Sequence, residues 1–415
     1  MHTIIIGGGV IGMTTALELR RRGVEVTLIE KSSLGKECSW GNCGLICPSH
    51  IYPLAVPGAV TKVMKLMLSK DAPVAMPLRW NPRLWGFLTR FTLRCNDKDA
   101  KQAALAKYTL LAKAESSWTE FFAEEKIDPE FERKGGLFIY RTQKGLDGLR
   151  GEAEELTRDF GQHWKMLDEK QLLTLEPGIK PGSSVGAWVC EEDTHLRPDL
   201  LMQQLAAALV TRGVKVLDNT EVASLRREGG KIVAVETVNG QSIQGDTFVL
   251  ATGAWAPKLE ETVGARLDIQ PGKGYSITMP QPKKGPVLPM IFNEDKVAVT
   301  PFKTGYRLGS TMEFAGYDTS FNDKRIGYIV RTAQRYLLDA TAEPVQEKWW
   351  GWRPMTPDGL PFIGWAPASS NLFINAGHNM EGLTLGAISG RLAAQVITGQ
   401  MAEIDLTPFQ VGRKI

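Results

Sequence analysis

The strongest constraint on the fold is the stretch from Thr3 to Lys31, in which the pattern of apolar residues changes twice. It opens with three consecutive isoleucines, breaks at three glycines, and then places apolar residues at helical spacing. Gly23 occupies the position of a helix C-cap glycine, and a second β-branched run follows and ends at Glu30. This order predicts a βαβ unit, consisting of a strand, a glycine turn, a helix and a second parallel strand.

The glycines of this unit have the spacing of a dinucleotide-binding fingerprint. Gly7 permits a tight turn, Gly9 lets the backbone approach a pyrophosphate, and Gly12 lets the helix lie close to the first strand. The anion would meet the free N–H groups at the helix N-terminus. Glu30 stands where a carboxylate can accept hydrogen bonds from a ribose 2′-OH. NAD and FAD proteins share this fingerprint, so the dinucleotide stays open at this point.

The length and charge of the chain limit the classes of protein it can belong to. At 415 residues it exceeds the size of one hydrophobic core, so we expect about two domains. The net charge of +3 does not favour a nucleic-acid partner. The first strand leaves no room for a signal peptide, and no apolar run approaches the roughly 18 residues of a membrane span. We therefore expect a cytoplasmic protein.

Cysteine usage argues against a disulfide framework. The five cysteines are an odd number and contain no CxxC pair. Three of them lie in CSWGNCGLIC, which resembles a metal site in spacing but lacks a nearby histidine pair or a fourth cysteine. We interpret them as small residues packed beside a cofactor, and we expect no metal. The cysteines are Cys38, Cys43, Cys47, Cys95 and Cys190.

Helix and strand patterns of the nucleotide-binding kind recur in the middle and at the end of the chain. After a buried strand, the small residues Ala251 and Gly253 suggest a backbone that runs close to a ligand. The expected fold is α/β, with a discontinuous Rossmann-like domain and a second, α+β domain that contains a largely antiparallel sheet. The predicted nucleotide domain comprises 1–58, 194–266 and 346–415, and the predicted substrate domain comprises 59–193 and 267–345.

Residues 59–95 form a basic and aromatic stretch with two interpretations. An amphipathic segment of this composition can lie on an anionic membrane surface. It can equally form two helices that pack their apolar sides on a domain and leave the basic residues in solvent. The residues concerned are Lys62, Lys65, Lys70, Arg79, Arg83, Arg90 and Arg94, with Asp71 as the acid and Trp80, Trp85, Phe87 and Phe91 as aromatic residues.

Several segments together carry a family resemblance. The opening unit, the SWGNCGL loop, PLAVPG, GKGYSIT, ATGAW, GWRPMTPDGLPFIG and GHNMEGLTLGAISGRLAAQVITG are distributed over both ends and the middle of the chain, while 96–190 matches only loosely. In these segments the chain resembles the D-amino-acid oxidase and dehydrogenase superfamily of FAD enzymes, and most closely its bacterial D-amino-acid dehydrogenases.

The resemblance implies a set of FAD contacts. Family members that attach flavin covalently use a cysteine in the C-terminal part, and no cysteine follows Cys190, so noncovalent FAD is expected. Val222 matches the strand position that meets the adenine, and the HNMEGLT loop would border the flavin ring. The expected FAD contacts are Gly7, Gly9, Ile11, Gly12, Glu30, Lys31, Ser39, Cys43, Gly44, Leu45, Val222, Met380, Glu381, Gly382, Leu383 and Thr384, to which the strand argument adds Ala251 and Gly253.

Amine oxidation moves a hydride from the substrate Cα to flavin N5, so the protein must chiefly hold the substrate in position. Arg353 matches the family's carboxylate-binding arginine, and the alternative for it is an ion pair with Asp358. Tyr275 is a second candidate for the carboxylate, or else a plain strand aromatic residue. His50 could face the substrate amine and help keep it neutral, or else cap a loop.

The resemblance implies oxidative deamination of D-amino acids to 2-oxo acids and ammonia, with electrons passed to a quinone of the respiratory chain or to a dye-type acceptor. One alternative is a glycine, sarcosine or D-hydroxyproline oxidase or dehydrogenase on the same fold. Another is an NAD-dependent dehydrogenase. If the basic stretch 59–95 lies on a membrane surface, it would add a peripheral contact with the inner membrane face, but packing on a domain is the favoured interpretation of this stretch.

Overall fold

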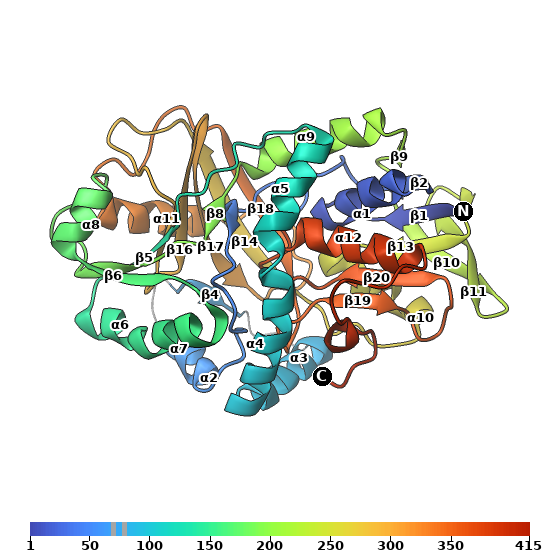
Figure 1. Ribbon diagram of the computed structural model, residues 1–415, viewed down its shortest axis with the longest axis horizontal. Coiled ribbons are helices and arrows are strands. Elements are labelled where there is room, and N and C mark those ends of the chain that lie inside the picture. The colour runs from blue at the N-terminus through green and yellow to red at the C-terminus, as the bar shows by residue number, and fades with distance from the viewer. Residues whose placement is uncertain (68–71, 77–80) are drawn as a thin grey trace.

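The computed structural model describes residues 1–67, 72–76 and 81–415. Lys70, Asp71, Arg79 and Trp80 of the basic stretch therefore lie outside the described residues. Two large sheets lie side by side along the long axis, one containing β1, β13 and β20 and the other containing β14, β16 and β17 (Figure 1).

The first sheet has six strands in the order β19-β20-β13-β1-β2-β9, and only β19 runs antiparallel to its neighbour. The predicted opening βαβ unit is present as β1, α1 and β2, and it supplies the middle of this sheet. The elements are β1 (His2–Ile6), α1 (Val10–Arg21), β2 (Glu25–Ile29), α9 (Pro198–Thr211), β9 (Lys215–Leu217), β13 (Thr247–Leu250), β19 (Phe362–Trp365), β20 (Leu372–Ala376) and α12 (Gly386–Ile397).

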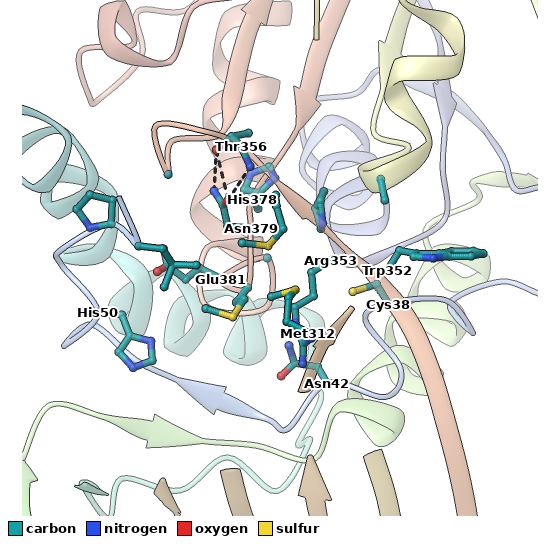
Figure 2. Close-up of a pocket in the computed structure, with 18 of the residues that line it drawn as sticks. Cys38, Asn42, His50, Met312, Trp352, Arg353, Thr356, His378, Asn379 and Glu381 are labelled. Carbon is teal, nitrogen blue, oxygen red and sulfur yellow. Dashed lines mark hydrogen bonds between the residues drawn. The ribbon is translucent and has the colours of Figure 1, made fainter. Parts of the chain in front are cut away.

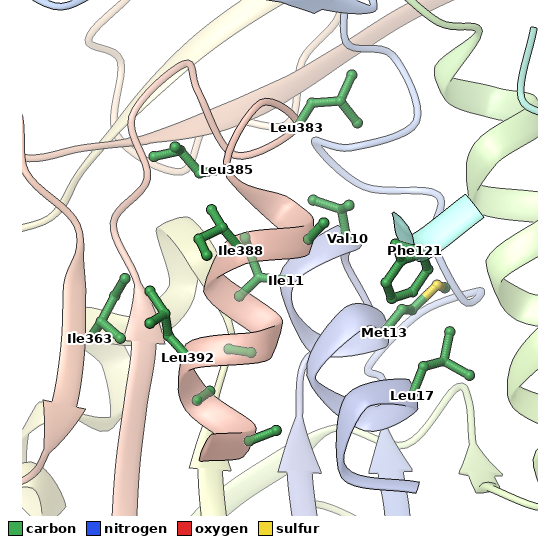
Figure 3. Close-up of a cluster of buried hydrophobic side chains, with 14 of the residues drawn as sticks. Val10, Ile11, Met13, Leu17, Phe121, Ile363, Leu383, Leu385, Ile388 and Leu392 are labelled. Atoms are coloured by element: carbon green, nitrogen blue, oxygen red, sulfur yellow. The ribbon is translucent and has the colours of Figure 1, made fainter. Parts of the chain in front are cut away.

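The helices α1 and α12 pack against each other on this sheet, although they lie at opposite ends of the chain (Figure 3). Gly390 makes the contact close, because a Cβ at this position would lie 2.7 Å from Oγ1 of Thr14. That hydroxyl donates to the carbonyl of Gly386 at 2.8 Å. Trp118 and Phe121 of α5 (Ala114–Glu125) pack in the same hydrophobic cluster. The two ends of the chain therefore share one core.

The second sheet has nine strands, in the order β18-β14-β17-β16-β15-β5-β7-β6 with β4 paired to β17. Among the described strands of this sheet, only the β15–β5 and β17–β4 pairs are parallel, so the sheet is largely antiparallel, as predicted. The strands are β4 (Val74–Ala75), β5 (Gly136–Tyr140), β6 (Trp164–Asp168), β7 (Gly186–Cys190), β14 (Gln270–Met279), β15 (Met290–Phe292), β16 (Val297–Phe302), β17 (Gly305–Glu313) and β18 (Glu347–Met355).

The remaining elements connect or cover these sheets. A small sheet of β10 (Val222–Glu228), β11 (Lys231–Thr237) and β12 (Ser242–Gln244) stands apart, and β3 (Leu45–Ile46) pairs with β8 (Thr194–His195). The helices are α2 (Ala59–Met67), α3 (Pro82–Arg94), α4 (Asp97–Leu111), α6 (Gln143–Gly148), α7 (Arg150–Phe160), α8 (Glu169–Leu175), α10 (Glu260–Val263) and α11 (Asp323–Tyr336), with 3₁₀ turns at Gly253–Leu259 and Thr407–Phe409.

Three elements make contacts that cross the predicted domain boundaries, which stay a prediction. The segment 346–415 was placed in the nucleotide domain, but β18 at its start pairs with β14 along its whole length and so belongs to the second sheet. The segment 59–193 was placed in the substrate domain, but α4 and α5 within it pack in the hydrophobic cluster of α1 and α12. These contacts join segments far apart in the sequence, which local patterns do not display.

The helix α3 has the arrangement expected of a helix packed on a domain. Leu84 and Phe87 are buried, while Arg83 pairs with Glu260 at 2.5 Å and Arg90 pairs with Asp268 at 2.8 Å. In the described part of the chain, no helix is both long and apolar enough to span a membrane. A peripheral membrane contact through 59–95 stays a prediction.

Arg307 on β17 fastens the second sheet to the loop that follows the βαβ unit. Its side chain is fully buried, and it donates to the carbonyls of Trp40 and Asn42, each at 2.8 Å. It also pairs with Asp199 at 3.1 Å and donates to Oγ1 of Thr278 at 2.9 Å. The loop is thereby held against β17.

Candidate functional site

A cavity of about 2030 Å³ is lined by residues from both sheets. Typical small-molecule sites measure roughly 300–1,000 Å³, so this cavity has room for a dinucleotide and a second molecule. Its walls combine the turns after β1, β2 and β13 with parts of β14, β17 and β18 and with the loop before α12.

The glycines of the fingerprint perform the predicted steric roles. Gly7 has a φ of 111°, and a Cβ there would lie 2.4 Å from the carbonyl oxygen of Ala251. A Cβ on Gly12 would lie 1.8 Å from the carbonyl oxygen of Gly7, so only glycine allows α1 to lie this close to the turn. Gly12 itself packs against this turn and does not line the cavity.

The start of α1 and the end of β2 have the features of an anion and ribose site. The first turn of α1 contains no acidic residue, and Gly9 provides no side-chain cap. Oγ of Ser39 accepts from the N–H of Val10 at 3.0 Å, and the next N–H groups of the first turn of α1 have no partner within the helix, which suits them to an anion. The buried carboxylate of Glu30 accepts from the N–H of Gly8 at 2.7 Å.

Two unpaired polar atoms support the fit of a dinucleotide. Oγ1 of Thr252 and Oδ1 of Asn375 are buried without a hydrogen-bond partner among the described residues, and both residues line the cavity. Buried polar atoms of this kind are normally satisfied by a partner. Sixteen of the predicted contacts line the same cavity: Gly7, Gly9, Ile11, Glu30, Lys31, Ser39, Cys43, Leu45, Val222, Ala251, Gly253, Met380, Glu381, Gly382, Leu383 and Thr384.

Gly44 is a predicted contact that the structure places elsewhere. It does not line the cavity, and a Cβ there would lie 2.1 Å from the carbonyl oxygen of Leu196. Its φ of 83° shows that glycine is needed for the turn and for this packing. Among its neighbours, Cys38 and Cys43 do line the cavity, and burial raises the pKa of Cys38 to about 11, which keeps the thiol protonated.

The loop before α12 is tied down from two sides. Oδ1 of Asn379 accepts from the N–H of Thr356 at 2.8 Å, which links the loop to the end of β18 (Figure 2). Glu381 pairs with Lys107 of α4 at 2.9 Å, and both side chains are buried. Burial raises the pKa of Glu381, while Lys107 acts in the opposite direction. Sequence reasoning missed Lys107, because a lysine within a charged helix usually lies in solvent.

Arg353 extends from β18 into the cavity, near Cys38, Met312 and Asn42 (Figure 2). Its Nη1 donates to the carbonyl of Thr311 at 2.7 Å. The alternative of an ion pair with Asp358 is wrong, because Asp358 pairs with Arg413 at 2.8 Å. Within the described residues, no carboxylate lies within ion-pair distance of Arg353. Its guanidinium is therefore a positive charge on the cavity wall without an acidic partner.

Tyr275 also lines the cavity, but its hydroxyl group is already bonded. It donates to Oε2 of Glu313 at 2.7 Å, and Glu313 pairs in turn with Arg325 at 2.7 Å. Burial, followed by the contact with Glu313, raises the pKa of the Tyr275 phenol. A role for Tyr275 in substrate binding stays a prediction, and it requires the hydroxyl to leave Glu313.

His50 also lines the cavity and lies to the lower left of Arg353 in Figure 2. Its ring stands edge-on to Phe138, with 6.1 Å between the ring centroids. Burial, with smaller contributions from Lys107 and Lys296, lowers the pKa of His50 to about 4. The imidazole is therefore neutral at ordinary pH, where it can accept a hydrogen bond. Its role stays a prediction.

The sheet topology and the cavity define a two-domain, dinucleotide-binding α/β protein. The FAD dependent oxidoreductase (DAO) family matches residues 2–396 of the chain. A D-amino acid dehydrogenase of Methylobacterium nodulans is 34% identical over 410 residues, which cover 97% of each chain. One from Agrobacterium fabrum is 32% identical and covers 100% of this chain and 99% of the relative. The chain therefore belongs to the family of FAD-dependent oxidoreductases.

Solved structures agree on the fold. Glycine oxidase from Geobacillus kaustophilus superimposes with a TM-score of 0.78 at 24% identity, covering 100% of this chain and 98% of that one. An L-α-glycerophosphate oxidase from Mycoplasma pneumoniae, which contains bound FAD, has a TM-score of 0.67 at 18% identity, with coverage of 100% and 98%. The protein is an FAD-dependent oxidoreductase, and the alternative of an NAD-dependent dehydrogenase is set aside.

Proposed function

We propose that the protein is a D-amino-acid dehydrogenase that uses noncovalent FAD. The observation that carries the proposal is the guanidinium of Arg353, which lines the cavity of the predicted FAD contacts and has no acidic partner among the described residues. A planar, permanently charged group is suited to hold the α-carboxylate of an amino acid. The names of the curated relatives support the D-amino acid as substrate.

The residues of the chain bind and orient the substrate, while bound FAD supplies the acceptor for the hydride that leaves Cα. Arg353 would fix the carboxylate and so direct the Cα–H bond. His50, which is neutral, would donate a hydrogen bond from its ring N–H to the lone pair of the substrate amine and so favour the uncharged form of the amine. The loss of two electrons gives an imino acid, and water then hydrolyses it to a 2-oxo acid and ammonia.

The electrons leave for a quinone of the respiratory chain or for a dye-type acceptor. The family resemblance and the basic stretch 59–95 support this part of the proposal, together with the expected contact at the inner membrane face. Formation of hydrogen peroxide, compared with reduction of a dye, is the discriminating measurement. A dehydrogenase reduces a dye in the presence of D-alanine and forms little hydrogen peroxide, whereas stoichiometric peroxide would identify an oxidase.

The central test is Arg353→Ala in the FAD-loaded enzyme. Loss of a charge-assisted pair corresponds to about 1.5–3 kcal/mol, so we expect KM for a D-amino acid to rise by roughly tenfold or more. FAD content should stay at the wild-type level, because Arg353 is expected to contact the substrate only. Steady-state kinetics and the flavin absorption spectrum measure the two quantities.

Arg413→Lys is the matched control, since Arg413 is also an arginine but pairs with Asp358 outside the cavity. Its KM should equal that of the wild type. Unchanged KM in Arg353→Ala would remove Arg353 from the substrate site. Flavin bleaching under anaerobic conditions with D-amino acids, L-amino acids and N-substituted glycines would separate D-amino-acid oxidation from the glycine, sarcosine and D-hydroxyproline alternatives.

A further inference from the structure

Arg353 reaches its position by crossing the strand next to its own. It lies on β18 opposite Gly272 of β14, and its Nη1 donates to Thr311 on β17, the strand beyond β14. The side chain therefore passes over β14 between these two points. The residue beneath the guanidinium is Gly274, where a Cβ would lie 2.1 Å from Nη1 and 2.4 Å from Cζ.

Gly274 is needed for space and not for its backbone conformation. Gly274 does not have a positive φ, so a residue with a side chain can adopt its backbone conformation. Any side chain there would meet the guanidinium and push it away from the sheet. The absence of a side chain at Gly274 thus determines where the charge of Arg353 lies.

The partner of Arg353 on β17 lies in a β-bulge. Lys273 pairs with Glu313 and Tyr275 pairs with Ser310, so Gly274 alone faces two residues, Thr311 and Met312. Bulges redirect backbone and side-chain groups and occur frequently beside active sites. Here the bulge directs the carbonyl of Thr311 toward Nη1 of Arg353.

The bulge is held in a strained conformation. Thr311 has a φ of 67°, which is a rare value for a β-branched residue, and the first residue of such a bulge is usually glycine. The neighbouring N–H of Met312 donates to the carbonyl of Pro73 at 2.8 Å, which secures the bulge from the side of β4. Strain of this kind persists where the surrounding structure holds it, and it gathers at functional sites.

From these contacts we infer that Gly274 and the bulge at Thr311–Met312 form a seat for the guanidinium of Arg353. Gly274 provides the space, and the carbonyl of Thr311 fixes one edge of the planar group. The inference rests on the proposed function, in which Arg353 binds the substrate carboxylate. Gly274 and Thr311 are then positioning residues, which act on the substrate only through Arg353.

The test uses Gly274→Ala in the FAD-loaded enzyme, with acetate as a simple carboxylate probe. Acetate binding is followed at equilibrium by the change in the flavin absorption spectrum, and KM and kcat are measured in parallel. We expect the Kd for acetate and the KM for a D-amino acid to rise by roughly tenfold, as for a displaced charge-assisted pair, with a smaller change in kcat and wild-type FAD content.

Gly305→Ala is the matched control in the same sheet. A Cβ there would lie 3.2 Å from Nη1 of Arg197, a guanidinium that pairs with Asp199 and does not line the cavity. Its acetate Kd should stay within about twofold of the wild-type value. An equal loss of acetate binding in both variants would show general damage to the sheet, and it would overturn the inference.

A double variant tests whether Gly274 acts through Arg353. Because effects through one shared group are not additive, Gly274→Ala should weaken acetate binding no further in an Arg353→Lys background. If Gly274→Ala weakens acetate binding by the same factor in the Arg353→Lys background, Gly274 does not act through Arg353 and the inference is wrong. If Arg353→Lys alone leaves acetate binding unchanged, the proposed function is wrong. If Arg353→Lys weakens acetate binding and Gly274→Ala does not, the proposed function stands and only the inference about Gly274 is wrong.

Discussion

At the scale of single residues, the sequence pointed to a charged side chain that the structure places on the cavity wall, but not to the residues that surround it. The GWRP motif marked Arg353 through a resemblance, and Arg353 lies in the cavity. The suggested partner Asp358 pairs instead with Arg413, which lies 55 residues further along the chain. The support from Gly274 and Thr311 was also missed. A glycine required for space has no distinguishing pattern in one sequence, and a bulge depends on the register of two strands.

His50→Asn tests the proposed role of His50 at the same scale. The pKa of His50 is lowered to about 4, so the folded enzyme protonates it only as the pH falls toward 4. Above about pH 5 the wild type and the variant should therefore have pH profiles of kcat/KM with the same shape. Loss of one hydrogen bond to the amine should lower kcat/KM by about fivefold, corresponding to about 1 kcal/mol.

Steady-state kinetics of the wild type and His50→Asn from pH 5 to 10 measure the shape of the pH profile and the size of kcat/KM. A wild-type transition near pH 6.5 that disappears in the variant would show that His50 titrates during catalysis, contrary to this prediction. An unchanged kcat/KM would assign His50 to the structure of the loop.

At the scale of helices and strands, short-range patterns predicted the elements that depend on short-range physics. The βαβ unit and the largely antiparallel sheet of the second domain follow from hydrophobic spacing and glycine positions. The assignment of α4 and α5 to the first core could not be predicted. The sequence of these two helices does not show which sheet their apolar residues will cover.

The buried pair between Lys107 and Glu381 gives a prediction for the joint between α4 and the loop before α12. Lys107→Met leaves Glu381 buried without a partner, and we expect a loss of about 3–5 kcal/mol in the free energy of unfolding. Urea denaturation monitored by fluorescence measures it. The double variant Lys107→Met with Glu381→Gln should recover most of the loss, because it contains no unpaired buried charge.

The loss should also depend on pH with a definite sign. Burial raises the pKa of Glu381, and removal of Lys107 takes away the charge that opposes this shift. The carboxyl therefore binds a proton more tightly in the folded state, and this contribution to stability decreases as the pH rises. Lys107→Met should accordingly lose less stability at pH 5 than at pH 8, and the reverse order would contradict a buried, unpaired carboxylate.

At the scale of the whole molecule, the two sheets and both ends of the chain contribute to one cavity. The α/β class with a second antiparallel sheet was confirmed, because the nucleotide fingerprint and the strand-rich segment each determine a sheet. The exact division of the chain stays a prediction. Strand pairing places β18 with the second sheet, and only the three-dimensional register reveals this.

FAD should stabilise the fold, because its predicted contacts come from segments at both ends and in the middle of the chain that line one cavity. A ligand that binds only the folded state adds about 2.7 kcal/mol at a free concentration of 100 times Kd. We expect Tm of the apoprotein to rise continuously with added FAD, as measured by calorimetry. Gly12→Ala serves as the control, because its Cβ would lie 1.8 Å from the carbonyl oxygen of Gly7 and distort the cofactor turn. If the Tm of the wild-type apoprotein does not change with added FAD, the predicted binding of FAD in this cavity is wrong.

The hydrogen bonds by which Arg307 attaches the loop after the βαβ unit to the second sheet have a consequence for biosynthesis. The cofactor loop is fastened to β17, and the walls of the cavity extend from Ile6 to Thr384 along the chain. A nascent chain on the ribosome therefore lacks one wall until nearly the entire polypeptide has emerged. We therefore expect FAD to be taken up only after synthesis of the chain is almost complete.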